Sequence, residues 1–249
     1  MPPISHDPSA TATQVLYVAD AYCGWCWGFA PHLAALEAAR RHVLPFRVIS
    51  GGLFVGEHSA PLGTYAYIPR ANERITQVTG AHFGEAYRSR LAEGTLRMDS
   101  TDAARGLAGL RAQAPERGLH LLHRMQEAFY RHGQSLSDPA TYRAIAEAED
   151  LDAERATAYL SGDEGRQAAE ADFHLAQRLG VHQFPTLLLL KDGVAHPLPA
   201  IGASLAEMSG ALDALLDAHH PGVLLGRESQ LSPEQPLQTT RADRQRLGR

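Results

Sequence analysis

The sequence predicts an α/β fold in which a long helical segment separates two groups of strands. Four short runs have the apolar or turn-linked character of strands, at 15–19, 46–50, 187–190 and 194–198. Helical stretches lie between the first two runs and on either side of the last two. From residue 60 to about 162, Ala, Arg, Glu and Leu dominate and no run resembles a strand. The predicted order is therefore strand–helix–strand, a helical insert, and helix–strand–strand–helix.

The first strand and the helix after it are the clearest elements of the N-terminal unit. Residues 15–19 are all apolar and rich in strand formers, which is typical of a buried parallel strand. The following helix is expected to extend to about His42, with Leu33 and Leu36 on one face. The second strand, at 46–50, completes a strand–helix–strand unit.

Helix start and stop signals divide the insert. Its helices are expected at about 71–93, 102–114, 118–132, 138–149 and 153–160. Asp138 and Pro139 open one helix, because proline is favoured in the first turn, and Pro115 separates two others. The next helix, at about 163–179, has the capping-box spacing of Ser161 and Glu164 at its start.

Two local signals define the C-terminal unit. Asp192-Gly193 predicts a hairpin turn after the leucine run. Ser204 and Glu207 predict a capping box at the start of the last helix. We therefore divide the chain into one sheet-containing domain at 14–59 and 163–220, an inserted all-helical domain at 60–162, and flexible tails at 1–13 and 221–249.

Composition and the two cysteines narrow the function. The formal net charge of −5 gives no indication of the basic surface that nucleic-acid binding needs. No apolar run approaches the roughly 18 residues of a membrane span, so neither nucleic acid nor a membrane is an expected partner. The first residues lack the basic and apolar regions of a signal peptide, so we expect a cytoplasmic protein. Cys23 and Cys26 are too close to stabilise the fold much by closing a loop, which indicates redox chemistry.

The spacing of the two cysteines predicts their roles. Cys23 would stand at the entrance of the first helix, where free N–H groups and the helix dipole favour the thiolate that attacks disulfides. Cys26 would lie one turn inside the helix, within reach of a mixed disulfide on Cys23. We therefore expect Cys23 to be the nucleophile and Cys26 the resolving thiol, with Gly24 permitting a tight helix entry. No cofactor is expected.

The motifs carry a resemblance to a known family: Cys23-Gly24-Trp25-Cys26 at the first helix, Pro31 five residues later, the helical insert, and Phe184-Pro185-Thr186 before a buried strand. Over about residues 14–220 they resemble the DsbA-like family of thioredoxin-fold proteins. The resemblance implies a thioredoxin fold, a cis Pro185 facing the cysteines, and a Phe184 backbone edge to which a substrate peptide adds as a strand. Trp25, Trp27 and Phe184 are expected to form an apolar rim that receives the substrate, with Pro185 beside it.

Two features distinguish this chain from the proteins that it resembles. Thioredoxins have a buried acid six residues before the first cysteine, whereas Tyr17 stands there, and Asp20 is not an obvious substitute. Glutathione-dependent relatives usually have serine at the position of Cys23. With no signal peptide, the chain is most similar to the cytoplasmic FrnE-like and isomerase-like branches.

Alternatives to a protein disulfide oxidoreductase or isomerase remain open. A glutathione-linked isomerase or transferase could use the same fold. A chaperone-like or zinc-binding module could retain a non-catalytic CxxC, with two histidines completing a zinc site; His120 and His123 are spaced to share a helix face. The strand–CxxC–helix setting favours the redox enzyme, without a bound metal. Its expected partners are thiols and disulfides of proteins or peptides, with glutathione or a thioredoxin-type reductant as candidate electron donors.

Overall fold

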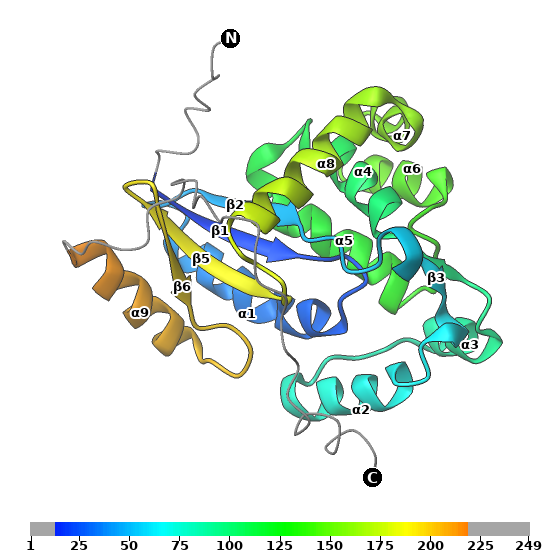
Figure 1. Ribbon diagram of the computed structural model, residues 1–249, viewed down its shortest axis with the longest axis horizontal. Coiled ribbons are helices and arrows are strands. Elements are labelled where there is room, and N and C mark those ends of the chain that lie inside the picture. The colour runs from blue at the N-terminus through cyan, green and yellow to red at the C-terminus, as the bar shows by residue number, and fades with distance from the viewer. Residues whose placement is uncertain (1–12, 219–249) are drawn as a thin grey trace, which may run out of the picture.

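The computed structural model describes residues 13–218 and has one main sheet. Its strands, in the order β2-β1-β5-β6, are β1 (Gln14–Ala19), β2 (Phe46–Ser50), β5 (Thr186–Lys191) and β6 (Val194–Leu198). β1 pairs with β2 in parallel and with β5 antiparallel, and β6 pairs antiparallel with β5. The sheet thus joins the blue and yellow segments of Figure 1, which the insert separates in sequence. This is the thioredoxin arrangement that the sequence predicts.

Helices cover both faces of this sheet. Alternate residues of β1 point to opposite sides. Val15 and Tyr17 belong to the core formed with α1 (Gly24–Arg40) and α9 (Leu205–Asp217). Leu16 and Val18 instead pack in the core under α8 (Asp163–Arg178). Burial on both faces explains why residues 15–19 of β1 are all apolar, without the polar alternation of an exposed sheet.

The insert is helical apart from one short strand pair. Its helices are α2 (Ile68–Thr79), α3 (Glu85–Glu93), α4 (Ser100–Arg111), α5 (Gly118–Tyr130), α6 (Pro139–Ala148) and α7 (Ala153–Ser161). β3 (Ala60–Pro61) and β4 (Arg97–Met98) form a two-stranded antiparallel sheet within it. In Figure 1, α4, α6 and α7 lie near α8, while α2 and α3 lie at the opposite end of the insert.

Two details of the predicted helices are wrong. The single helix expected at 71–93 is two helices, because Gly80 adopts a left-handed conformation (φ 72°) and ends α2. The capping box expected from Ser161 and Glu164 does not form. Ser161 is the last residue of α7, and Gly162 occupies the cap position of α8 without a side-chain bond.

Other local signals are confirmed. The Asp138 side chain caps α6, with Pro139 in the first turn. Ser204 and Glu207 form the capping box of α9. Asp192 and Gly193 both adopt positive φ, as a tight hairpin turn between β5 and β6 requires.

A buried ion pair connects the insert to the sheet. Arg111, at the end of α4, forms an ion pair with Asp172 of α8, with a nitrogen–oxygen distance of 3.1 Å. The Asp172 carboxylate also accepts a hydrogen bond from the Ser50 N–H at 3.0 Å, and Arg111 donates to the Val48 carbonyl of β2. These bonds fix α4 of the insert against α8 and against β2 of the main sheet.

The ends of the chain are outside this description. The tails expected at 1–13 and 221–249 fall outside the described residues, apart from Thr13. Within residues 13–218, no helix is both long enough and apolar enough to cross a membrane.

Candidate active site

Cys23 is the N-cap residue of α1. Its backbone is extended (φ −83°, ψ 111°), and its sulfur accepts a hydrogen bond from the Cys26 N–H at 3.3 Å. A sulfur in this position receives a free amide hydrogen of the first turn, which favours negative charge on it. Cys26 lies inside the helix with no exposed surface, whereas Cys23 keeps 5%. Both are thiols in the structure.

The Phe184–Pro185 segment lies opposite Cys23. The peptide bond between the two residues is cis, as predicted. The Cys23 thiol donates to the Phe184 carbonyl oxygen over 3.5 Å, so this segment is in contact with the sulfur. The Phe184 ring occupies space beside Gly51, where a Cβ atom would come within 1.9 Å of the ring. Gly51, the residue after β2, is therefore needed for Phe184 to reach this position.

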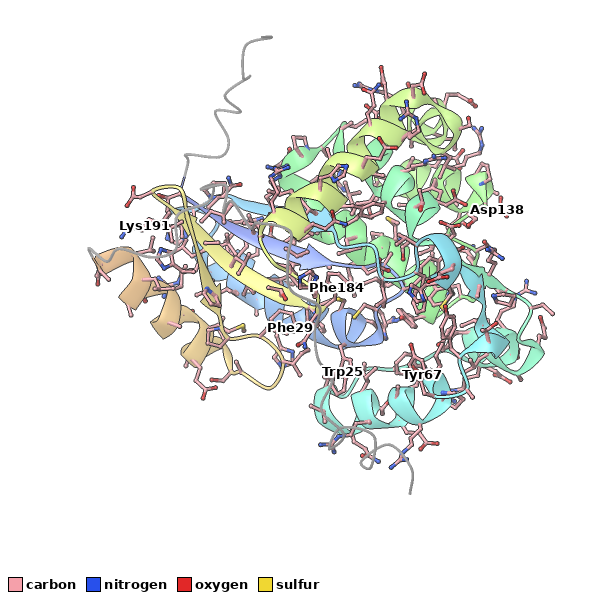
Figure 2. All side chains as sticks on the ribbon, viewed as in Figure 1. Trp25, Phe29, Tyr67, Asp138, Phe184 and Lys191 are labelled. Atoms are coloured by element: carbon pink, nitrogen blue, oxygen red, sulfur yellow. The ribbon has the colours of Figure 1, made fainter. Side chains whose placement is uncertain are left out.

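A cavity of about 370 Å³ opens over the Cys23 sulfur. That volume lies within the ~300–1,000 Å³ typical of small-ligand sites. Cys23, Trp25 and Phe184 line one side, and Tyr67 and Asn72 of the insert line the other. Figure 2 shows Trp25 and Tyr67 between the start of α1 and helix α2, and Phe184 on the other side of the start of α1, near the start of β5. The lining contains no Asp, Glu, Lys or Arg side chain from the described residues, so the cavity favours an uncharged or apolar group next to the reacting sulfur.

Two glycines of α1 let α2 pack closely over the site. A Cβ at Gly24 would lie 2.7 Å from the Ile75 side chain, and one at Gly28 would lie 2.5 Å from the Thr79 hydroxyl. Both distances are shorter than atoms tolerate. We predicted that Gly24 permits a tight helix entry. Gly24 has a second role in the structure, because it also leaves room for the side chain of Ile75, which lines the cavity.

Buried polar groups hold the loop that carries Cys23. The Asp20 carboxylate accepts hydrogen bonds from the backbone N–H groups of Tyr22 at 2.9 Å and Leu53 at 2.8 Å. Burial raises the pKa of Asp20, and these amide bonds oppose the rise. From the insert, the Tyr130 hydroxyl donates to the Tyr22 carbonyl at 2.6 Å. The peptide preceding Cys23 is thus fixed from both parts of the chain.

The surroundings of Cys26 keep it protonated. Burial and then the neighbouring Cys23 sulfur raise the pKa of the Cys26 thiol well above its ordinary value. A protonated, buried thiol does not compete with Cys23 for substrate at the cavity. The arrangement can therefore support attack by Cys23 followed by resolution from Cys26.

Trp27 does not form part of the rim that we predicted. Its side chain is 4% exposed, and its indole N–H donates to the His82 carbonyl at 3.2 Å. The ring stacks between His123 and Tyr130 of α5, at centroid distances of 5.2 and 5.8 Å. Because Trp27 is only two residues from Trp25, the helix turns it away from the cavity and into the interface with the insert.

The histidines considered as zinc ligands have other partners. His120 lies 2.8 Å from the Glu149 carboxylate, and His123 stacks on Trp27. Within residues 13–218, no three or more His, Cys, Asp or Glu side chains gather as a metal site would require. The described residues thus give the zinc alternative no ligand set around Cys23 and Cys26.

The insert supplies the residues that sequence reasoning missed. Tyr67, which precedes α2, lines the cavity over Cys23 together with Asn72 and Ile75 of α2 and Tyr130 of α5. His182, three residues before Pro185, also lines it, which agrees with its position in the sequence. The paired glycines at Gly24 and Gly28, four residues apart on one helix face, were the available signal that a second helix packs there.

Comparison with known proteins agrees with this geometry. The model of the DSBA-like thioredoxin domain family matches residues 14–207. A putative protein disulfide isomerase from Nitrosomonas europaea superposes with a TM-score of 0.72 at 21% identity, covering 84% of this chain and 99% of that one. The cytosolic disulfide reductase DsbM from Pseudomonas aeruginosa superposes with a TM-score of 0.70 at 27% sequence identity, covering 82% of this chain and 100% of that one. A structure of that reductase with GSH superposes with a TM-score of 0.68 at 26% sequence identity and the same coverage of both chains.

A curated relative has a different described role. The ClpXP adapter protein SpxH from Shouchella clausii is 20% identical over 185 residues, which are 74% of this chain and 60% of that protein. The chain therefore matches less than two thirds of that relative's length. The family match, by contrast, includes both parts of the sheet, the cysteine pair and the Phe184–Pro185 segment. On this evidence the chain belongs to the DsbA-like thioredoxin family.

Proposed function

We propose that this protein is a thiol–disulfide oxidoreductase that reduces or rearranges disulfides of peptides, proteins or glutathione. Cys23 attacks one sulfur of the substrate disulfide, forming a mixed disulfide and releasing one thiol. Cys26 then attacks the Cys23 sulfur, the second substrate thiol leaves, and a Cys23–Cys26 disulfide remains. Two molecules of an external thiol such as glutathione, or one dithiol, then reduce this disulfide by two successive exchanges and leave as a disulfide themselves.

The observation that carries this proposal is the setting of the Cys23 sulfur. It receives the Cys26 N–H at 3.3 Å, faces the Phe184 carbonyl at 3.5 Å and lines the 370 Å³ cavity. A substrate sulfur entering the cavity therefore meets Cys23 before any other thiol. The Phe184 backbone and the half-buried Trp25 lie beside it, where an extended peptide can bind.

The cytosolic reductase supports a reducing role and a cytoplasmic location for this chain. It is 27% identical, and its whole length is covered. Its structure with GSH makes glutathione a candidate substrate or electron donor here. Glutathione has charged ends, whereas no charged side chain of the described residues lines the cavity, so we place its cysteine within the cavity and its charged ends at the rim.

Trapping experiments test the division of labour. With a peptide that contains one disulfide, Cys26→Ser should accumulate a mixed disulfide on Cys23 that mass spectrometry identifies. Cys23→Ser should form none, because Cys26 is fully buried. Equal trapping by the two variants would contradict the assignment.

The same assay separates the enzyme from a module that only binds. Such a module, whether an adapter or a zinc protein, would bind the peptide without release of thiols. Wild-type protein that binds but releases no thiol from glutathione disulfide or from the peptide would exclude the proposed function.

A further inference from the structure

A second, smaller cleft lies between α1 and α5, away from the substrate cavity, and has a volume of about 180 Å³. Exposed residues, among them Ala34 and His120, form its mouth, whereas Tyr17 and Gln126 on its walls are buried. The rest of the wall is mostly apolar and includes Ala30, Pro31, Leu33, Leu119 and Leu122. A concave apolar site with a few polar groups is the usual form of a small-ligand site.

Three polar atoms on these walls have no hydrogen-bond partner among the described residues. They are the Tyr17 hydroxyl, His123 Nδ1 and Gln126 Nε2, and all three are buried. Buried polar groups in folded proteins are almost always satisfied. Gln126 is the clearest case, because it is 1% exposed and its amide nitrogen can only donate. An occupant of the cleft therefore needs an acceptor atom for Gln126.

His123 supplies an acceptor on the same walls. Its Nε2 lies 4.0 Å from the Glu127 carboxylate, so a proton on Nε2 faces that carboxylate and Nδ1 is left to accept. Burial is the main cause that lowers the pKa of His123, with Arg131, His120 and Arg124 adding to the effect and Glu127 opposing it. The ring is therefore neutral at pH 7, and its Nδ1 matches an N–H group of a ligand.

The proline within α1 adds to this polarity. Pro31 lines the cleft and has no N–H group, so the carbonyl of Trp27, four residues earlier, lacks the donor that a helix normally provides. This turn of α1 thus presents a further acceptor beside the cleft. The described lining contains no Asp, Glu, Lys or Arg side chain, so an ionised ligand would be buried without a counter-charge.

We propose that the cleft between α1 and α5 binds a small neutral molecule that combines one apolar ring with an amide group. The amide oxygen accepts from Gln126 Nε2 and the Tyr17 hydroxyl, and the amide N–H donates to His123 Nδ1. An apolar cavity of about 150 Å³ is enough to bind benzene. A cleft of about 180 Å³ therefore holds one ring with a small substituent. This site is separate from the thiol chemistry and does not depend on the proposed function.

Trp27 provides a reporter for this cleft, because its ring stacks on His123 with centroids 5.2 Å apart. In Trp25→Phe, Trp27 is the single tryptophan of the chain. Titration of this variant with benzamide should give a saturable change in tryptophan fluorescence, and ligand-observed NMR should show the same binding to the wild-type protein. Benzoate and benzylamine carry the same ring with a negative or a positive charge. Each should bind at least about tenfold more weakly.

Matched variants locate the compound. Gln126→Met keeps a side chain of similar length without the amide and should weaken benzamide binding about three- to tenfold, as expected for one lost hydrogen bond. Ala34→Leu at the mouth should abolish binding, while Ala35→Leu, exposed on the same helix but outside the lining, should not change it. Ala71→Leu narrows the substrate cavity instead and should also leave the affinity for benzamide unchanged.

Each part of the proposal has a result that would overturn it. Lack of saturable benzamide binding to the wild-type protein would exclude the site. Binding lost in Ala71→Leu but kept in Ala34→Leu would place the compound in the substrate cavity and exclude the site as well. Equal affinity for benzoate or benzylamine would overturn the ligand class, and unchanged affinity in Gln126→Met would overturn the assigned hydrogen bond. A protein that binds benzamide but exchanges no disulfide would refute the proposed function and support this site.

Discussion

The close contact between Gly51 and Phe184 makes Gly51→Ala a sharp test of how the site is positioned. A Cβ at Gly51 would lie 1.9, 2.2 and 2.7 Å from three atoms of the Phe184 ring. Carbon atoms in contact are about 3.5–4.0 Å apart, so the ring must move by roughly 1.5–2 Å. The Phe184 carbonyl, which faces Cys23, would move with it. Overpacking of this kind costs about 1–3 kcal/mol.

We expect Gly51→Ala to lower the free energy of unfolding by that amount and to slow attack of Cys23 on a peptide disulfide by tenfold or more. Denaturant unfolding and stopped-flow thiol release measure the two effects. Gly210→Ala is the matched control, because Gly210 lies in α9, no neighbouring atom of residues 13–218 comes within 4 Å of its added Cβ, and alanine is the better helix former. It should stabilise the protein by up to about 1 kcal/mol without altering the rate.

A double variant decides whether the ring is the cause. Phe184→Ala removes the atoms that the new Cβ would meet. In Gly51→Ala/Phe184→Ala, the additional loss of stability from Gly51→Ala should therefore nearly disappear, as a strong non-additive coupling. If the two losses simply add, or if Gly51→Ala leaves the exchange rate unchanged, the reasoning about this contact is refuted.

Three further outcomes follow from the structure. Arg111→Met leaves the Asp172 carboxylate buried without its cation, so the free energy of unfolding should fall by about 3–5 kcal/mol in urea; a loss below 1 kcal/mol would contradict the role of this ion pair. In Cys23→Ser protein, burial still raises the pKa of Cys26, so the pH midpoint of its alkylation should lie above the usual ~8.5, and a midpoint at or below 8.5 would be inconsistent with that environment. Lys191 donates to three carbonyls at the end of α9 (Figure 2), so Lys191→Met should reduce hydrogen-exchange protection in the last turn of that helix and leave α1 unaffected.

Local signals in the sequence predicted the sheet and the cysteine pair. Apolar runs identified the strands, and the spacing of Cys23 and Cys26 predicted that Cys23 stands at a helix entrance with Cys26 one turn inside the helix. The exposed Cys23 that this spacing suggests is not found, because its side chain is 5% exposed and reaches the surface only through the cavity. The Phe184–Pro185 segment was placed opposite the cysteines through a family resemblance, and the structure has it there. The strands and the helix entrance depend on short segments whose neighbours in sequence are also their neighbours in space, whereas the place of Phe184, 161 residues from Cys23, came from the resemblance alone.

The rest of the site depends on how the insert packs, which no local pattern determines. Tyr67 and Asn72 reach the cavity only because α2 crosses α1 over two glycines, and nothing near them in sequence indicates a redox site. Trp27 was misplaced because its surroundings come from α5, about 100 residues away. Tyr17 was recognised as a departure from the thioredoxin pattern, but the residues of α1 and α5 around it come from packing that its neighbours in sequence do not indicate.

The central claim is that Cys23 and Cys26 form a reversible dithiol–disulfide pair. Equilibration of the protein with mixtures of reduced and oxidised glutathione, followed by acid quenching and mass spectrometry, tests it most directly. We predict one transition in which two thiols per chain are lost together as a Cys23–Cys26 disulfide, and no such disulfide in Cys23→Ser or Cys26→Ser. Persistence of both thiols under strongly oxidising mixtures, or a stable glutathione adduct on Cys23 with Cys26 still reduced, would contradict the account.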